Sequence, residues 1–262
     1  MRHARLRNAT PRSSPGKEEY LALLRSARQD PNIVGLILTG SRAAGPVTRF
    51  SDYDVRVIVK DRVANRYRRR FPRRSSGLDV AVGGEKEFER HAALGSPMEW
   101  DGFAFARAKV LLDRSGRIAR LAKEKGRVPR ARLRTYVSRN LDGYINAVYR
   151  SLKAHRDGNL LASHLEASQS LPLLLNVLFG VEGRRTPYAK YLEWELAKFP
   201  LRGLPLSRPV LLRMFRQVLT TGSPTAQRTL FVTVERNLRR SGFGAIYDGW
   251  GPVDLAFLRK PR

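Results

Sequence analysis

A nine-residue segment of alternating character, DYDVRVIVK at residues 52–60, constrains the fold of this chain most strongly. Successive side chains of a β-strand point to opposite faces of a sheet, so the alternation predicts a strand with one apolar and one mixed face. The apolar face carries Val55, Val57 and Val59, and the other face carries Asp52, Asp54, Arg56 and Ile58. The two aspartates of such a strand point the same way, with their backbones roughly 7 Å apart.

A glycine-serine pair precedes this segment at the end of another apolar run. The run NIVGLIL at residues 32–38 predicts a strand that continues through Thr39 into Gly40 and Ser41. Glycine permits a tight turn whose backbone N–H groups can meet phosphate oxygens, and the serine hydroxyl adds a further donor. The pair is therefore a candidate phosphate-binding turn.

A third acidic residue, Asp79, lies in the alternating segment GLDVAV at residues 77–82. This segment predicts a neighbouring strand, so we expect Asp79 to lie beside Asp52 and Asp54 at one edge of a sheet. Carboxylates without histidine or cysteine suit Mg²⁺, which serves phosphoryl chemistry through one or two carboxylates and substrate phosphates. The simpler alternatives are a solvated turn for residues 52–54 and a surface acid on an edge strand for Asp79.

Together these motifs resemble the pattern of the nucleotidyltransferase superfamily typified by DNA polymerase β, especially its antibiotic (aminoglycoside) adenylyltransferase branch. The matching motifs are Gly40-Ser41-Arg42-Ala43, Ser51-Asp52-Tyr53-Asp54-Val55 and Leu78-Asp79-Val80. The resemblance implies that the first motif and Ser51 bind the nucleotide triphosphate, with Gly40, Ser41 and Arg42 as its contacts. It also implies that Asp52 and Asp54 bind Mg²⁺, while Asp79 completes the metal site or acts as a base. Some of these enzymes have glutamate at the third position, so the metal role of Asp79 is better supported than the base role.

A looser match lies downstream, where RRTPYAKYL at residues 184–192 is similar to a segment of the helical domain of those adenylyltransferases. This similarity implies that Lys190 contacts phosphate. The resemblance as a whole covers residues from about 18 to 200. It implies transfer of a nucleoside monophosphate, AMP from ATP, to a hydroxyl of a small molecule such as an antibiotic, with release of pyrophosphate.

The charge of the chain differs from what a polycationic acceptor requires. Fifty Lys and Arg face 23 Asp and Glu, which gives a net charge of +27. Such a charge repels an aminoglycoside at long range and is typical of proteins that bind nucleic acid or another polyanion. A GC-rich coding sequence also produces an excess of arginine, so a purely compositional origin stays equally open.

The densest basic cluster lies between the second and third acidic motifs, with Tyr67 and Phe71 among its members. It comprises Arg62, Arg66, Arg68, Arg69, Arg70, Arg73 and Arg74. A solvated segment without a dedicated partner accounts for it, and so does a surface that attracts phosphate beside the acidic edge. Nucleotidyl transfer to RNA or protein, as in toxin–antitoxin systems, therefore remains an alternative, as does a non-catalytic nucleotide-binding protein.

The periodicities predict an α+β chain in which an N-terminal mixed-sheet domain, residues 16–123, precedes a C-terminal helical bundle, residues 124–262. Residues 1–15 are expected to form a flexible basic arm. In the sheet domain we expect helices at 17–30 and 85–94 and a further strand within 103–112. In the bundle we expect helices at 131–157 and 160–179, the second bent near Pro172, and N-caps at Thr186-Pro187 and Ser223-Pro224.

Other features exclude whole classes of protein. The chain has no cysteine, which excludes disulfides and Cys-ligated zinc and is compatible with the cytoplasm. Its four histidines, His3, His91, His155 and His164, are too scattered in sequence for a zinc site. No stretch approaches about 18 continuous apolar residues, so we expect no membrane span. The sequence does not distinguish a monomer from a homodimer.

Overall fold

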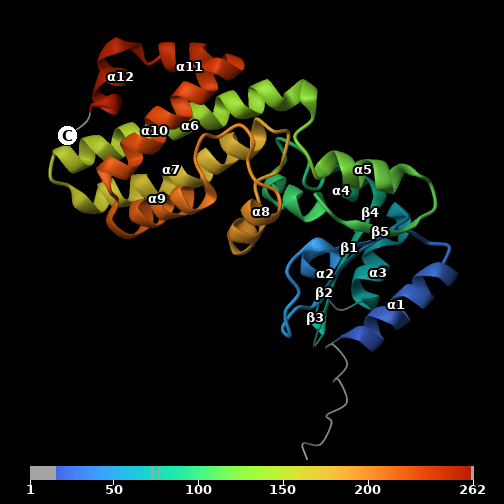
Figure 1. The fold of residues 1–262 in the computed structure, drawn as a ribbon. Helices are drawn as coiled ribbons and strands as arrows, with labels where there is room; N and C mark the ends of the chain where they lie inside the picture. The colour runs from blue at the N-terminus through green and yellow to red at the C-terminus, as the bar shows by residue number, and fades with distance from the viewer. Residues whose placement is uncertain (1–15, 72–73, 76, 261–262) are drawn as a thin grey trace, which may run out of the picture. The chain divides into compact units, whose positions relative to one another are not determined.

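The computed structural model describes residues 16–71, 74–75 and 77–260 (Figure 1). Contacts between Cα atoms divide the chain into two compact units, one ending at Gly126 and the other beginning at Arg127. The first unit contains the sheet, and the second is helical. The prediction that the chain folds as two domains, divided between residues 123 and 124, stays a prediction. The arm expected at residues 1–15 lies outside the described residues.

Five strands in the described part of the first unit form one mixed sheet, in the order β3-β4-β2-β1-β5. The strands are β1 (Ile33–Thr39), β2 (Tyr53–Val59), β3 (Arg74–Ser75), β4 (Leu78–Gly84) and β5 (Lys109–Asp113). The pair β2 and β4 is parallel, whereas the other neighbours are antiparallel. The three strands predicted at residues 32–38, 52–60 and 77–82 are thus confirmed to within two residues.

Helices cover both faces of this sheet (Figure 1). Helices α1 (Lys17–Gln29) and α3 (Ala64–Arg70) pack against the three buried valines of β2. Helices α4 (Glu85–Arg90) and α5 (Arg117–Lys125) and the 3₁₀ helix η2 (Glu99–Phe105) cover the other face, which includes Ile58. The two-faced character predicted for residues 52–60 is therefore confirmed, and each face buries apolar side chains against helices.

The region between β4 and β5 differs from the prediction. The helix predicted at 85–94 ends at Arg90, because His91 is extended and buried Ala92 has a φ of 57°. Residues 103–105 belong to η2 rather than to a strand, and β5 begins only at Lys109. Phe105 packs edge-on against Phe88 of α4 at 5.8 Å between ring centroids. A 3₁₀ turn thus buries Phe105, one of the apolar residues that suggested a strand.

The sequence analysis missed helix α5. Asp113 at the end of β5 accepts hydrogen bonds from the backbone N–H groups of Ser115 (3.0 Å) and Ala119 (2.8 Å). Burial would raise the pKa of the Asp113 carboxyl, but these bonds hold it below its usual value. The carboxylate therefore supplies acceptors to the first turn of a helix that begins beyond Gly116.

The second unit consists of helices along most of its length. They are α6 (Arg130–Arg156), α7 (Leu160–Gly180), η3 (Ala189–Tyr191), α8 (Leu192–Lys198), α9 (Arg208–Thr221), α10 (Pro224–Leu238), the π-helical turn η4 (Arg239–Phe243), α11 (Gly244–Asp248) and α12 (Gly251–Arg259). Helix α6 buries one apolar stripe, formed by Val137, Leu141, Ile145, Val148 and Leu152. None of the helices described is long and apolar enough to cross a membrane.

One of the two predicted N-caps in this unit is confirmed and the other is wrong. The Ser223 hydroxyl accepts from the backbone N–H of Ala226 at 3.2 Å, at the start of α10. Thr186 begins no helix, and the next element, η3, starts at Ala189. The Thr186 hydroxyl instead donates to Asn176 Oδ1 of α7 at 2.6 Å. A long-range contact therefore replaces the local cap.

A buried carboxylate, Glu235, joins the last helices of the chain. Its side chain accepts from Arg239 Nε and Arg259 Nε, both at 2.8 Å, and Arg239 also bonds Asp248 at 2.7 Å. Burial would raise the pKa of Glu235, but the hydrogen bonds from Arg259 and Arg239 hold it below its usual value. The contacts therefore link α10, η4, α11 and α12.

We expect Glu235→Gln to reduce the free energy of unfolding by about 2 kcal/mol at pH 7, because the negative charge that both guanidinium groups bond is removed. The folded pKa lies below the unfolded value of about 4.3, so the ion pairs stabilise fully above that value. Their contribution disappears as pH falls through the folded pKa, and parent and variant converge only below that pKa. Urea denaturation at several pH values measures this. Glu193→Gln, whose pair with Arg216 is exposed on both sides, is the control and should change little.

Candidate functional site

Two of the predicted acidic residues lie side by side on the parallel strands. Asp54 of β2 and Asp79 of β4 are Cα partners in the register of the pair. Asp54 belongs to the same face of β2 as Arg56 and Ile58, which is the face covered by α4 rather than by α1 and α3. Asp52 directly precedes β2 and is exposed. The strand pairing thus brings Asp54 and Asp79 together, with Asp52 at the start of the strand.

The glycine of the candidate phosphate turn lies against one of these carboxylates. Strand β1 ends at Thr39, which pairs with Asp54, and the short helix α2 (Gly40–Ala44) follows. Gly40 has a φ of 67°, and a Cβ atom at this position would lie 1.9 Å from Asp54 Oδ2. Thr39 Oγ1 also donates to the Asp54 carbonyl oxygen at 3.3 Å. Residues 40 and 54 therefore form one local structure that has no room for a side chain at position 40.

Arg42, after Gly40, is hydrogen-bonded to Ser51, before the first aspartate. The Arg42 guanidinium donates to the Ser51 carbonyl oxygen from Nε (3.0 Å) and Nη2 (2.6 Å), and lies over the Tyr53 ring at 4.2 Å. Ser51 Oγ accepts from Thr48 N at 2.9 Å. These contacts fix the loop between α2 and β2. Contact of Arg42 and Ser51 with a nucleotide stays a prediction.

Ser41 differs from Arg42 and Ser51 in its hydrogen bonding. Its side chain is largely buried beside Gly40, and its hydroxyl makes no hydrogen bond to any residue that the structure describes. The backbone carbonyl of Ser41 accepts from Gly45 N at 2.8 Å inside α2. The hydroxyl is therefore available to an added ligand, as a phosphate contact would require.

The donor chemistry of the acidic residues fits Mg²⁺ in part. Asp52 and Asp54 supply hard carboxylate oxygens, and the close approach of Gly40 restricts the Asp54 carboxylate. Asp79 pairs with the exposed Arg74 at 3.3 Å between Arg74 Nε and Asp79 Oδ2. No three acidic or histidine side chains in the described ranges come together as a metal site. The three aspartates thus do not form a ready ligand set, and the metal role predicted for them stays a prediction.

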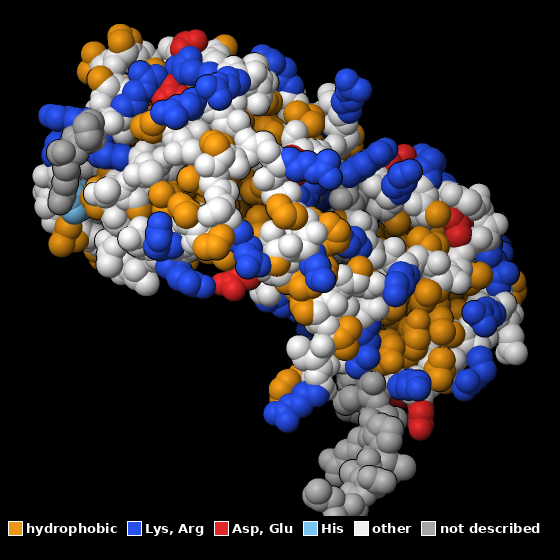
Figure 2. All heavy atoms as spheres, in the orientation of Figure 1, with side chains coloured by type: hydrophobic (Ala, Val, Ile, Leu, Met, Phe, Trp, Pro, Cys, Tyr) orange, Lys and Arg blue, Asp and Glu red, His pale blue; other side chains and the backbone are white. Residues whose placement is uncertain are grey.

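Most of the basic cluster lies on helix α3, away from the acidic pair. Helix α3, which carries Arg66 to Arg70, packs on the face of the sheet opposite Asp54. Arg68 pairs with Glu87 and donates to the Val82 carbonyl oxygen at 3.3 Å. Arg74 is the exception through its pair with Asp79, and Arg73 lies outside the described residues. Figure 2 shows Lys and Arg side chains spread over the visible surface of both units.

Lys190 belongs to the second unit, in the 3₁₀ helix η3. Its side chain is exposed, and Nζ lies 4.9 Å from the centroid of the Tyr191 ring. The first unit alone carries the acidic residues and the candidate phosphate turn. The phosphate contact of Lys190 therefore stays a prediction.

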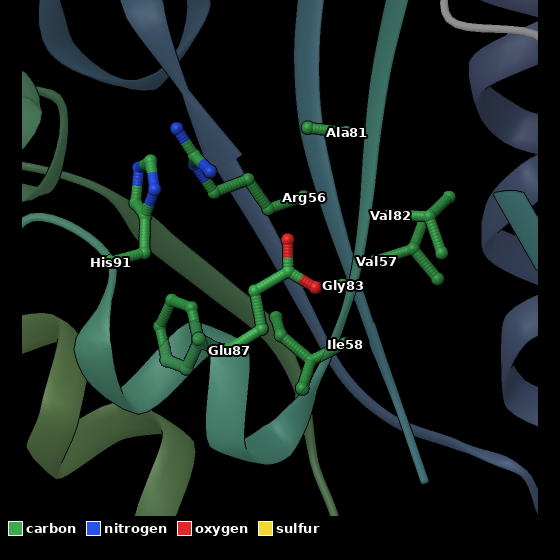
Figure 3. A pocket seen from close by; sticks show the side chains of 9 residues that line it. Arg56, Val57, Ile58, Ala81, Val82, Gly83, Glu87 and His91 are labelled. Carbon is green, nitrogen blue, oxygen red and sulfur yellow. The ribbon is translucent and has the colours of Figure 1, made fainter. Parts of the chain in front are cut away.

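The sequence analysis also missed a pocket on the face of the sheet that carries Asp54, Arg56 and Ile58, called the acidic face below (Figure 3). Strands β2 and β4 and helix α4 line it with Arg56, Val57, Ile58, Ala81, Val82, Gly83, Glu87, Phe88 and His91. Asp101 of η2 is nearly buried and holds both Arg56 and His91, whose Nε2 lies 2.6 Å from Asp101 Oδ2. The sequence analysis had already placed Arg56 on the same strand face as Asp52 and Asp54. Asp101 is 45 positions from Arg56 and carries no motif that predicts this contact.

Comparisons with known proteins leave the family of this chain undetermined. No protein-family model matches the sequence, and no curated protein matches it significantly. Among solved structures it is similar to a nucleotidyltransferase-like protein from Exiguobacterium sibiricum 255-15, with 14% sequence identity and a TM-score of 0.46. The similarity covers 92% of this chain and 85% of the other. At this TM-score the likeness supports no inference about function.

Proposed function

We propose that the protein transfers a nucleoside monophosphate, AMP from ATP, to a hydroxyl group of a small acceptor and releases pyrophosphate. The observation that carries this proposal is the contact between the Gly40 backbone and the Asp54 carboxylate, beside Asp79 on the next strand. A turn suited to phosphate and a carboxylate suited to a metal thus share one site. The motif resemblance to nucleotidyltransferases supports the same reaction.

In this reaction Ser41 donates its hydroxyl hydrogen bond to the triphosphate. Asp52 and Asp54 are the residues that would hold Mg²⁺ at this site. When bound, the divalent cation offsets negative charge on the triphosphate and on the departing pyrophosphate. Gly40 contributes by keeping the Asp54 carboxylate in place, because any larger residue would displace it.

Asp79 lies next to Asp54 on the neighbouring strand, so in the proposed reaction its carboxylate would lie beside the acceptor hydroxyl. The acceptor oxygen forms a bond to phosphorus while the bond from the α-phosphorus to the bridging oxygen breaks. The bonding pair leaves with pyrophosphate, and the hydroxyl proton passes to the Asp79 carboxylate. Arg74 orients that carboxylate through its ion pair.

The direct test incubates the protein with each nucleoside triphosphate, Mg²⁺ and a mixed panel of hydroxyl compounds. We expect pyrophosphate release that needs ATP, the metal and at least one acceptor, and a product heavier than the acceptor by one AMP group. If ATP binds equally with and without Mg²⁺ and no acceptor yields pyrophosphate, a non-catalytic nucleotide-binding protein becomes the better explanation.

Ser41→Ala and Lys190→Ala are each expected to raise the dissociation constant for ATP about tenfold, because each removes one hydrogen bond to a charged phosphate. Neither residue belongs to the buried apolar core, so the melting temperature should change little. Calorimetric titration with ATP and Mg²⁺ measures the effect, and Lys198→Ala, another exposed lysine of the second unit, is the control. Unchanged affinity in both variants would show that the proposed nucleotide contacts are wrong.

Transfer to RNA or protein remains the alternative, and the net charge of +27 favours RNA. Helix α3 packs on the opposite face of the sheet from Asp54, so most of its exposed arginines are poorly placed to guide an RNA end to that residue. Including RNA oligonucleotides in the acceptor panel separates the cases. Labelled RNA product, without any small-molecule product, would favour the alternative.

A further inference from the structure

The pocket on the acidic face starts two residues further along β2 and β4 than the Asp54–Asp79 pair of the proposed transfer site. Asp54 pairs with Asp79, and two residues further along the same strands Arg56 pairs with Ala81. All four belong to the same face of the sheet, because side chains alternate along a strand. The two pairs are therefore separated by roughly 7 Å along the sheet. A small molecule of ordinary size spans that distance.

Small residues on β4 create the space in this pocket. Ala81 and Gly83 occupy the positions on the pocket face that follow Asp79, under helix α4. A Cβ atom at Gly83 would lie 3.3 Å from Glu87 Oε2, so a longer side chain would displace Glu87. Larger residues at these two positions would fill the pocket. Figure 3 shows Arg56, Glu87 and His91 pointing into the same space.

The Arg56 guanidinium is held in a fixed place but keeps donors to spare. One nitrogen, Nη2, donates to Asp101, and the group lies 5.1 Å from the centroid of the Phe105 ring. Its Nε and Nη1 make no hydrogen bond to any residue within the described ranges. Asp101 also binds His91, so part of its negative charge is directed to a group other than Arg56. A guanidinium held in this way is well suited to an additional oxygen ligand.

The ion pairs around the pocket cancel in charge, so its preference for an anion rests on the Arg56 donors left unbonded by Asp101 and on the charge of the whole chain. Glu87 is the acidic side chain among the lining residues, and it pairs with Arg68. Arg56 and His91 are both paired with Asp101. At long range the net charge of +27 attracts anions and repels polycations. Arginine binds carboxylate and phosphate groups through paired N–H donors.

We propose that this pocket binds an anionic group of the acceptor, a carboxylate or a phosphate, through Arg56. The acceptor is then a small hydroxyl compound that carries negative charge, with its hydroxyl directed toward Asp79 and its anion toward Arg56. This proposal rests on the proposed transfer reaction, since the reaction defines the acceptor. It gives Arg56 the role of a substrate-binding residue, and it gives Ala81 and Gly83 the role of providing room.

The first experiment measures anion binding without any transfer. The protein is saturated with α,β-methylene-ATP and Mg²⁺ to fill the nucleotide site, and inorganic phosphate or acetate is then titrated in. The readout is the NMR signal of the arginine Nε–H group that disappears in Arg56→Lys. We expect this signal to shift with at least one of the two anions, and the stronger ligand identifies phosphate or carboxylate. Ala81→Leu, which fills the pocket but leaves the Arg56–Asp101 pair, should abolish the shift.

The second experiment measures transfer to matched pairs of hydroxyl acceptors, with and without an anionic group. We expect Arg56→Gln and Ala81→Leu each to raise the KM of the anionic acceptor about 30-fold, with the KM for ATP unchanged. Arg62→Gln removes the same charge from an exposed residue of the helical layer on the other face and should behave like the parent.

The results of the two experiments separate the two proposals. Equal use of neutral and anionic acceptors by the parent and by both pocket variants would overturn the anion pocket while the transfer reaction stands. Anion binding that depends on Arg56 and Ala81, without transfer to any acceptor, would support the pocket and contradict the proposed reaction. An Arg56 signal that responds to neither anion would overturn the pocket whatever the transfer assay shows.

Discussion

Asp54→Asn is expected to lower the rate of pyrophosphate release by at least about 10³-fold, because loss of one charged metal ligand raises the barrier by several kcal/mol. Asparagine has nearly the shape of aspartate, and it keeps an oxygen beside Gly40, so the fold should remain intact. Steady-state assays with ATP and a working acceptor measure the rate, and circular dichroism confirms folding.

The control for this variant is Asp61→Asn, which makes the same chemical change in the same unit. Asp61 accepts a hydrogen bond from the Lys86 backbone at 3.1 Å and lies beyond the far end of β2. Its amide variant keeps an acceptor and should retain parental activity. Activity of Asp54→Asn above about one-tenth of the parent would contradict the role assigned to this carboxylate.

Gly40→Ala is expected to reduce transfer by about 10²-fold and to destabilise the fold by about 2 kcal/mol. Two effects combine at this position. The left-handed φ of 67° costs about 1 kcal/mol for a residue with a Cβ atom. In addition, the new Cβ would lie 1.9 Å from Asp54 Oδ2, so the carboxylate has to move.

Gly116→Ala separates these two effects. Gly116 has a similar φ of 71°, but a Cβ atom there would meet nothing within 4 Å. This variant should show the backbone cost alone, with parental activity. Parallel measurements of unfolding by urea and of pyrophosphate release give the comparison. Equal activity of both glycine variants would show that the position of the Asp54 carboxylate does not matter for transfer.

The sequence predicted those parts of the first unit that depend on local patterns. Alternation along residues 52–60 identified β2 and its two faces, and the similar pattern around Asp79 identified its parallel neighbour. The residue at position 40 was recognised from its type, because glycine before serine at the end of a strand suggests a special backbone conformation. The functions of these residues remain proposals.

The features that were missed depend on contacts between distant segments. Phe105 and its neighbours are apolar enough for a strand, but packing against Phe88 favours a 3₁₀ helix. Thr186, predicted as an N-cap, instead donates a hydrogen bond to Asn176. The side of the sheet on which α3 packs, and hence the place of its arginines, depends on the crossover between β2 and β4. No local pattern contains this information.

The parallel pairing of β2 with β4 has a consequence for how the chain tolerates insertions and deletions. Backbone hydrogen bonds between the two strands set the distance between Asp54 and Asp79, so the length of the connection that contains α3 and β3 does not affect it. Extra residues in that connection leave the two acids adjacent. One residue removed from β4 after Asp79, or added there, shifts Asp79 by one position along the strand, and the carboxylate then points toward the α1 and α3 layer. Related chains that keep both acids adjacent are therefore expected to vary in the length of this connection but not within the strands.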